Sequence, residues 1–126
     1  MKPLLFCLLL AQISVDGSAD LSVITNAISR GDASTLGQYF DQAVEIAVLD
    51  TEDVYSKNKA VEVVQTFFSS NAPQAFIKAH EGTSKGNDSQ YCIGNLKTNT
   101  QTFRVYIYVK VVSGNYLIQE LRFDQE

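Results

Sequence analysis

One histidine, His80, is the single place where histidine-based catalysis or zinc binding could form in this chain. A catalytic zinc site usually takes three protein ligands, and no second histidine or cysteine accompanies His80 at a recognisable spacing. If Phe76 and Lys78 share its face of a strand, His80 lies at the margin of the sheet. We interpret it as a structural or rim residue, with a role as general base or ligand contact as the alternative.

Acidic residues form a second candidate, at Asp41 and again over residues 50–53. Their spacing does not fit a calcium-binding EF-hand loop, so a solvated loop is the better interpretation. An isomerase-like site would need an acid or base among aromatic side chains. Tyr39, Asp41 and Tyr55 are of the right types, but their spacing does not single them out.

A glycine-bounded stretch, Gly82 to Gly86, has some character of a phosphate-binding loop. It lacks the Walker spacing and no helical pattern follows it, so it is interpreted as a turn between strands. We predict neither a cofactor nor a metal. No catalytic constellation stands out, so whether the protein is an enzyme stays open, with a non-enzymatic role favoured.

The bulk composition limits the classes of partner. The chain has 126 residues and a formal net charge of −4, with ten Lys and Arg residues against fourteen Asp and Glu. Binding to nucleic acid requires a basic face that neutralises phosphates, and binding to an anionic membrane requires a polybasic patch. We therefore expect neither partner, and the length suits one domain.

Residues 1–19 have the pattern of a secretory signal peptide. Lys2 precedes an apolar run over residues 4–11, and small residues at 17–19 predict cleavage before Asp20. We expect an exported protein, periplasmic or secreted, that consists of one domain over residues 20–126 and has no membrane anchor after cleavage; the alternative is a retained N-terminal anchor. Cleavage removes Cys7, and the remaining Cys92 is expected to be a buried, inert thiol.

Helical patterns occupy the first half of this domain. Apolar residues at positions 21, 24 and 28 predict a helix that ends at Gly31, a residue suited to a left-handed cap. Asp32 or Ser34 caps a second short helix that ends near residues 39–40. A third helix is predicted over residues 59–70, before Pro73.

Strands are predicted over residues 44–49, 76–81 and 90–97, with a polar turn over 50–53. A long hairpin over residues 102–123 completes the sheet. Helices first and a meander of strands afterwards indicate an α+β fold, in which the helices cover one face of an antiparallel sheet.

The register of the hairpin can be predicted, because a slip of one residue moves every side chain to the opposite face. A three-residue loop at 113–115 pairs Val111 with Leu117, Ile107 with Leu121 and Val105 with Phe123 on an apolar face. A two-residue loop at 114–115 would instead place Glu120 and Arg122 among apolar residues. We expect the three-residue loop, with Gln119 as the one polar residue on the apolar face.

The other face of this hairpin is rich in tyrosine and arginine, which are enriched in protein interfaces. The expected cross-strand pairs are Arg104 with Asp124, Tyr106 with Arg122, and Tyr108 with Glu120. We predict a binding surface there for a protein partner, above all a second copy; the alternative is a solvated sheet face. Its candidate residues are Arg104, Tyr106, Tyr108, Lys110, Glu120 and Arg122.

The order of elements resembles the nuclear transport factor two-like fold, also called cystatin-like or SnoaL-like. The segments GDASTLGQYF, YSKNKAVEVVQTFF, FRVYIYVK and YLIQELRFD carry this resemblance, which covers residues 20–126. HEGTSKG, YCIGNL and IQELRF more narrowly resemble a family of small exported bacterial proteins known as a domain of unknown function. The resemblance implies helices in the concavity of a curved sheet, and often pairing through that sheet, but no particular activity.

Two functions are therefore considered. The first is a non-enzymatic binding or homodimerisation module that uses the exposed sheet face. The second is a binder of an apolar small molecule, or an isomerase-like or dehydratase-like enzyme, that uses the pocket of the cone. The candidate lining residues of that pocket are Tyr39, Phe40, Tyr55, Phe67, Phe76 and His80.

Overall fold

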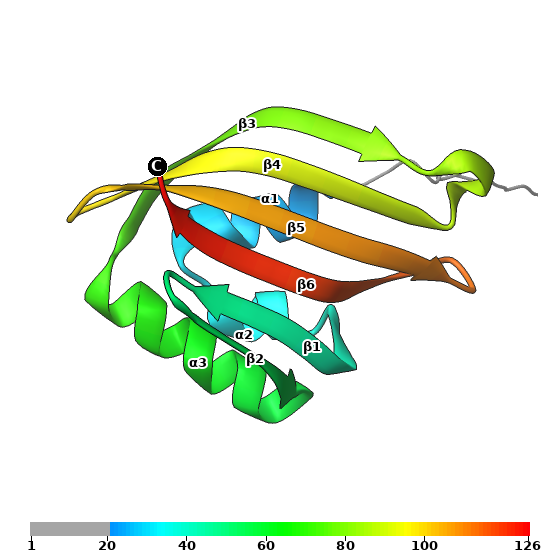
Figure 1. Cartoon of the computed structure of the whole chain (residues 1–126), viewed down its shortest axis with the longest axis horizontal. Helices are drawn as coiled ribbons and strands as arrows, with labels where there is room; N and C mark the ends of the chain where they lie inside the picture. The colour runs from blue at the N-terminus through cyan, green and yellow to red at the C-terminus, as the bar shows by residue number, and fades with distance from the viewer. Residues whose placement is uncertain (1–20) are drawn as a thin grey trace, which may run out of the picture.

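The computed structural model of the chain describes residues 21–126, and the predicted signal peptide lies outside the described residues. Three α-helices gather on one side of a curved sheet (Figure 1). No helix within residues 21–126 is long and apolar enough to cross a membrane. In chain order the elements are α1 (Ser22–Arg30), α2 (Ala33–Gly37), β1 (Phe40–Val48), β2 (Thr51–Ser56), α3 (Lys57–Ser70), β3 (Pro73–Thr83), a short 3₁₀ turn (Lys85–Asn87), β4 (Ser89–Thr98), β5 (Thr102–Val112) and β6 (Asn115–Gln125).

The helix ends follow the capping residues. Gly31 ends α1 in the left-handed conformation, with φ 67°, as predicted. The Asp32 carboxylate caps α2 by accepting a hydrogen bond of 3.0 Å from the backbone N–H of Thr35. The Ser56 hydroxyl caps α3 by accepting from the backbone N–H of Lys59. The second helix is shorter than predicted, because the chain leaves it after Gly37 to enter β1.

The sheet has six strands in the order β2-β1-β6-β5-β4-β3. Neighbouring strands are antiparallel except β1 and β6, which run parallel and place the C-terminal strand in the middle of the sheet. Two sequence predictions were wrong here. The strand predicted over 44–49 begins at Phe40. The polar turn predicted over 50–53 lies mostly in the edge strand β2, whose pairing with β1 runs from Thr51 opposite Val48 to Ser56 opposite Ala43.

The β5–β6 hairpin follows the predicted register over most of its length. Ile107 pairs with Leu121 and Val105 with Phe123. The predicted three-residue loop was wrong: Ser113 (φ 51°) and Gly114 (φ 80°) form a two-residue turn of the kind that suits the strand twist. A bulge at Gln119 then restores the register, so Leu117 faces Lys110 rather than Val111.

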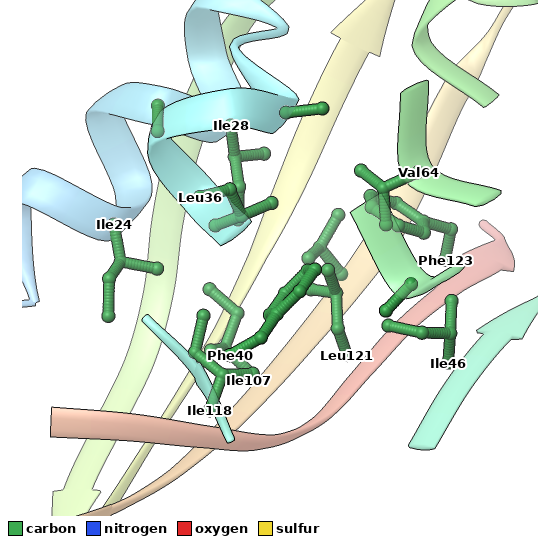
Figure 2. Packing of buried hydrophobic residues seen from close by; sticks show 14 of the residues in the cluster. Ile24, Ile28, Leu36, Phe40, Ile46, Val64, Ile107, Ile118, Leu121 and Phe123 are labelled. Atoms are coloured by element: carbon green, nitrogen blue, oxygen red, sulfur yellow. The ribbon is translucent and has the colours of Figure 1, made fainter. Parts of the chain in front are cut away.

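The concave face of the sheet carries the core. Side chains from α1, α2 and α3 meet apolar residues of the sheet, with Phe40 among them (Figure 2). Phe67 of α3 stacks on Phe123 of β6 with ring centroids 4.2 Å apart. Both Phe40 and Phe123 are almost completely buried. The α+β architecture, with helices in the concavity of the sheet, is therefore as predicted.

Candidate interaction surface

The convex face of the sheet is formed by the outward-pointing side chains of all six strands, and within residues 21–126 no helix covers it (Figure 1). Residues paired across neighbouring strands point the same way, so the register defines rows across the face. Three of them lie in the middle, between the outer rows that carry Lys97 and Lys110. The Arg122 row consists of Glu52, Ala47, Arg122, Tyr106, Ile93 and His80. The Glu120 row consists of Val54, Glu45, Glu120, Tyr108, Tyr91 and Gly82. The Asp124 row consists of Asp124, Arg104, Asn95 and Ile77.

Aromatic rings occupy the middle of the convex face. Tyr91 and Tyr106 are stacked, with ring centroids 6.4 Å apart. Tyr91 also lies over Gly82, where an added Cβ would come within 2.9 Å of the Tyr91 ring carbon Cζ. Only glycine leaves room for the ring at that position. Tyr91 remains 37% exposed, so this aromatic surface is available for contact.

Arg122 joins acidic side chains from three strands. Its guanidinium lies 3.2 Å from a carboxylate oxygen of Glu120 and 3.4 Å from one of Glu52. Glu45 and Asp124 each lie 3.9 Å away. One cation therefore serves four carboxylates, and this part of the surface keeps a strong negative charge.

The titration of these groups follows from their neighbours. Glu45 shares a hydrogen bond with Glu52, and this bond, together with partial burial and the Glu120 charge, raises the pKa of Glu45. The same hydrogen bond and the Arg122 charge lower the pKa of Glu52. The hydrogen bond to Glu120 leads the causes that raise the pKa of Arg122, which stays charged. Burial, then the Glu120 charge, raises the pKa of Tyr106 and keeps its hydroxyl a donor.

The other half of the convex face is basic. Lys97 of β4 and Arg104 and Lys110 of β5 are all exposed. Within residues 21–126, none of the three forms a salt bridge. The outward side chains of β3, β4 and β5 include no carboxylate. The structure therefore brings together all six residues predicted for the sheet-face site, with Glu120 and Arg122 on the acidic half and Arg104 and Lys110 on the basic half.

The residues predicted to line a pocket are divided between two places. Phe40 and Phe67 are buried in the core, and Tyr39, Tyr55 and Phe76 pack against it. His80 lies apart from them, because a bulge between Lys78 and His80 turns it to the convex face, opposite Ile93. The supposition that Phe76, Lys78 and His80 share one face was therefore wrong. His80 is exposed on the edge strand β3.

An open apolar groove of about 360 Å³ lies between α3 and the end of β1. Of the predicted pocket residues it includes Phe67. Its lining is Val48, Val63, Thr66, Phe67, Ser70 and Asn71.

Asp41 and Cys92 have different local environments. Asp41 is held by Gln119, whose amide donates a hydrogen bond of 2.8 Å to the carboxylate, and this bond leads the causes that lower the pKa of Asp41. Cys92 is buried, as predicted, and burial raises the pKa of its thiol to about 11. In the part of the chain that the structure describes, no group of three or more His, Cys, Asp or Glu is placed to hold a metal ion.

Several residues of the convex face were not identified from the sequence. Tyr91, Ile93 and Lys97 alternate with buried residues of β4, and this alternation was a usable signal. Glu45 and Glu52 had no such signal in the sequence. They meet Arg122 only through the parallel pairing of β1 with β6, and Arg122 follows them by about 75 residues.

Comparisons with known proteins place this geometry in a family. The family model described as "Domain of unknown function (DUF4783)" matches residues 21–124. A DUF4783 family protein from Bacteroides ovatus ATCC 8483 is similar in structure, with 30% sequence identity and a TM-score of 0.78, covering 83% of this chain and 94% of that chain. A comparison with curated proteins finds no match.

More distant structures show the fold. A protein of unknown function with a cystatin-like fold from Nostoc punctiforme has 8% identity and a TM-score of 0.63, covering 83% of this chain and 84% of that chain. An NTF-2 like protein of unknown function from Shewanella oneidensis has 12% identity and a TM-score of 0.62, covering 83% and 93%. The predicted nuclear transport factor two-like, cystatin-like fold is confirmed.

Proposed function

The chain belongs to the DUF4783 family, and from that premise we propose that it is a non-enzymatic module that binds a second copy of itself through the convex face of its sheet. We propose further that it acts after export, in the periplasm or outside the cell, as the N-terminal pattern of the sequence indicates.

One observation carries the dimer proposal: the helices all pack on the concave side and leave a face with large apolar and aromatic side chains uncovered. Tyr91 is 37% exposed, Val54 at one edge of the sheet 62% and Ile77 at the other 64%. Exposed apolar and aromatic side chains gathered on one uncovered face are a feature of contact sites in soluble domains. Tyrosine and arginine are also the residues that dominate binding energy in interfaces.

The test is the oligomeric state in solution, measured by sedimentation equilibrium and native mass spectrometry. We expect the unmodified protein to dimerise, and Tyr91→Ala with Tyr106→Ala to raise the dissociation constant by roughly tenfold or more. Val23→Ala removes an exposed aliphatic side chain from α1, on the other side of the molecule, and should change nothing. A protein that stays monomeric at every concentration tested would refute the proposal.

A second candidate is supported by the groove beside α3. Its volume of about 360 Å³ lies within the range of small-molecule sites, roughly 300–1,000 Å³. It would hold an apolar molecule against Val48, Val63 and Phe67. Fluorescence of 1-anilinonaphthalene-8-sulfonate tests this candidate: the dye should bind to the unmodified protein and not to Val63→Phe, in which the larger ring fills the groove. Equal binding to both proteins would reject it.

A further inference from the structure

The convex face divides into two halves of opposite charge. Glu52 of β2, Glu45 of β1, and Glu120 and Asp124 of β6 surround the Arg122 guanidinium; these five groups carry a net charge of −3 and form the acidic half. Those of β5, β4 and β3 carry three cations, Lys97, Arg104 and Lys110, and no carboxylate, a net charge of +3, and form the basic half. A surface of this kind is complementary to itself, provided that the two copies are placed correctly.

Convex face meets convex face when the twofold axis lies between the two sheets and parallel to them. Two directions of this axis keep the strands of the two sheets aligned, as in aligned sheet packing. An axis along the strands, between β5 and β6, lays each acidic half on the partner subunit's basic half. An axis across the strands lays each strand on its own copy, so the acidic halves meet each other. The second arrangement opposes like charges, which is costly at an interface.

The three rows support the axis along the strands, because this axis lays each row on itself in reverse order. In the Arg122 row, the guanidinium then lies over the partner subunit's Tyr106, a cation–π contact, and the small Ala47 lies opposite the partner subunit's Ile93. At the ends of this row, Glu52 meets the partner subunit's His80. An axis across the strands at this row would instead oppose Arg122 to its own copy.

The two neighbouring rows also pair favourably with themselves. In the Asp124 row, Arg104 faces the partner subunit's Asp124, which gives an ion pair twice over. In the Glu120 row, Glu120 faces the partner subunit's Tyr108, whose hydroxyl can donate to the carboxylate. These pairs lie next to the axis, so they survive the rotation of about 30° that is usual between packed sheets.

The outer part of the Glu120 row adds a match of shape. A surface depression of about 390 Å³ is lined by Glu45, Glu52, Asp53 and Val54. The axis along the strands brings the partner subunit's Tyr91 over Glu45. The exposed ring can then enter the depression and donate a hydrogen bond to this carboxylate, and Val54 meets the same partner ring, because Tyr91 covers Gly82 within its own subunit.

We propose that the twofold axis of the dimer runs along the strands between β5 and β6, with Arg104 paired to the partner subunit's Asp124 and Arg122 stacked on the partner subunit's Tyr106. This inference rests on the proposed function, because it specifies how the same face meets a second copy. In the proposed arrangement the charged halves of the two subunits attract each other. With the axis across the strands, halves of like charge would meet and repel.

The first test uses the unmodified protein and varies the salt concentration. Raising the ionic strength from about 50 mM to about 500 mM should raise the dimer dissociation constant by roughly tenfold, since salt screens the attraction between exposed charges. A dissociation constant that falls with salt would show that like charges meet, and would overturn the proposed axis. A constant that does not respond would also overturn it, because the charged halves would then lie outside the contact.

The second test reverses charge on each half. The basic-half variant is Arg104→Glu with Lys110→Glu, and the acidic-half variant is Glu120→Lys with Asp124→Lys. We expect each alone to dimerise about tenfold or more weakly than the unmodified protein, and an equimolar mixture to form a heterodimer in native mass spectrometry. Far-UV circular dichroism confirms folding. If the basic-half variant does not fold, Arg104→Glu alone replaces it in the sedimentation experiment, and if the acidic-half variant does not fold, Asp124→Lys alone replaces it.

The outcomes separate the two proposals. Variants that dimerise as tightly as the unmodified protein, or more tightly, overturn the axis while the dimer through the convex face stands. An unmodified protein that never dimerises overturns the proposed function and the axis with it.

Discussion

The two faces of this sheet are made by the same strands and follow opposite rules. On the concave face, Phe103, Val105, Ile107 and Val109 of β5 are completely buried under the helices. On the convex face of the same strand, Arg104, Tyr106, Tyr108 and Lys110 keep exposure and meet charged neighbours. The folded monomer satisfies the concave face by itself. The convex face leaves aromatic and charged side chains exposed, which is why the proposed function is placed there.

The largest expected loss of stability comes from a substitution in the core on the concave face. Phe123 is completely buried and stacks on Phe67, so Phe123→Ala should cost about 3–5 kcal/mol of unfolding free energy, from lost burial and the cavity left behind. Urea unfolding measures this, and the loss should not depend on protein concentration. Tyr91→Ala on the convex face is the matched control, whose effect should grow with the population of dimer. A Phe123→Ala loss under about 1 kcal/mol would contradict this account of the core.

A smaller effect compares two adjacent positions, Cys92 and Tyr91, which point to opposite faces. In a Cys7→Ser background, the Cys92 thiol should react with 5,5′-dithiobis(2-nitrobenzoic acid) only as fast as the core opens, because it is buried and its pKa is raised to about 11. With Tyr91→Cys added, one thiol should react rapidly in dilute, monomeric protein and be protected at high concentration. Rapid labelling of Cys92 in folded protein would show that the concave face opens readily.

The smallest effect lies at Gln119, the bulge where β6 shifts its register. Gln119→Leu removes the leading hydrogen bond that lowers the pKa of Asp41, so this pKa should rise towards its ordinary value of 3.8. A carboxyl group whose pKa is lower in the folded state than in the unfolded state stabilises the fold at pH values above the unfolded pKa. This stabilisation is lost as the pH falls through the folded pKa. The variant should therefore lose stability above about pH 4 and converge with the unmodified protein below it.

Carboxyl NMR titration measures the Asp41 shift directly. Asp32 is the internal control, because its pKa is lowered first by hydrogen bonds with Thr35, which the substitution leaves intact. An unchanged Asp41 titration would mean that Gln119 does not hold this carboxylate in solution.

Local patterns predicted most of the fold. A few neighbouring residues are enough to predict the helix caps at Gly31 and Asp32. The same holds for the alternation of apolar and polar residues along β5 and most of β6. The strand β2 was not predicted, because an edge strand buries few apolar residues and its sequence, TEDVYS, has the composition of a polar turn. The bulge at Gln119 escaped because Leu117 and Ile118 are equally apolar, and only packing decides which of them points inward.

Only the part of the candidate site that lies on the β5–β6 hairpin was predictable from the sequence. Tyr106, Tyr108 and Arg122 lie on one hairpin, whose register follows from its own sequence. The charge division of the face was not predictable, because it depends on which strands lie beside β6. Glu45 and Glu52 become neighbours of Arg122 only when β1 pairs with it in parallel, a contact that no local pattern encodes.

The central position of β6 has a consequence for folding in time. This strand, the last of the six to be synthesised, lies between β1 and β5, and until it is in place neither half of the sheet has its neighbour. A ribosome would release the helices and the β1–β2 hairpin long before the segment that joins them to the β3–β5 meander. The nascent chain should therefore stay incompletely folded until residues 115–125 emerge, and then close in one late, non-local step.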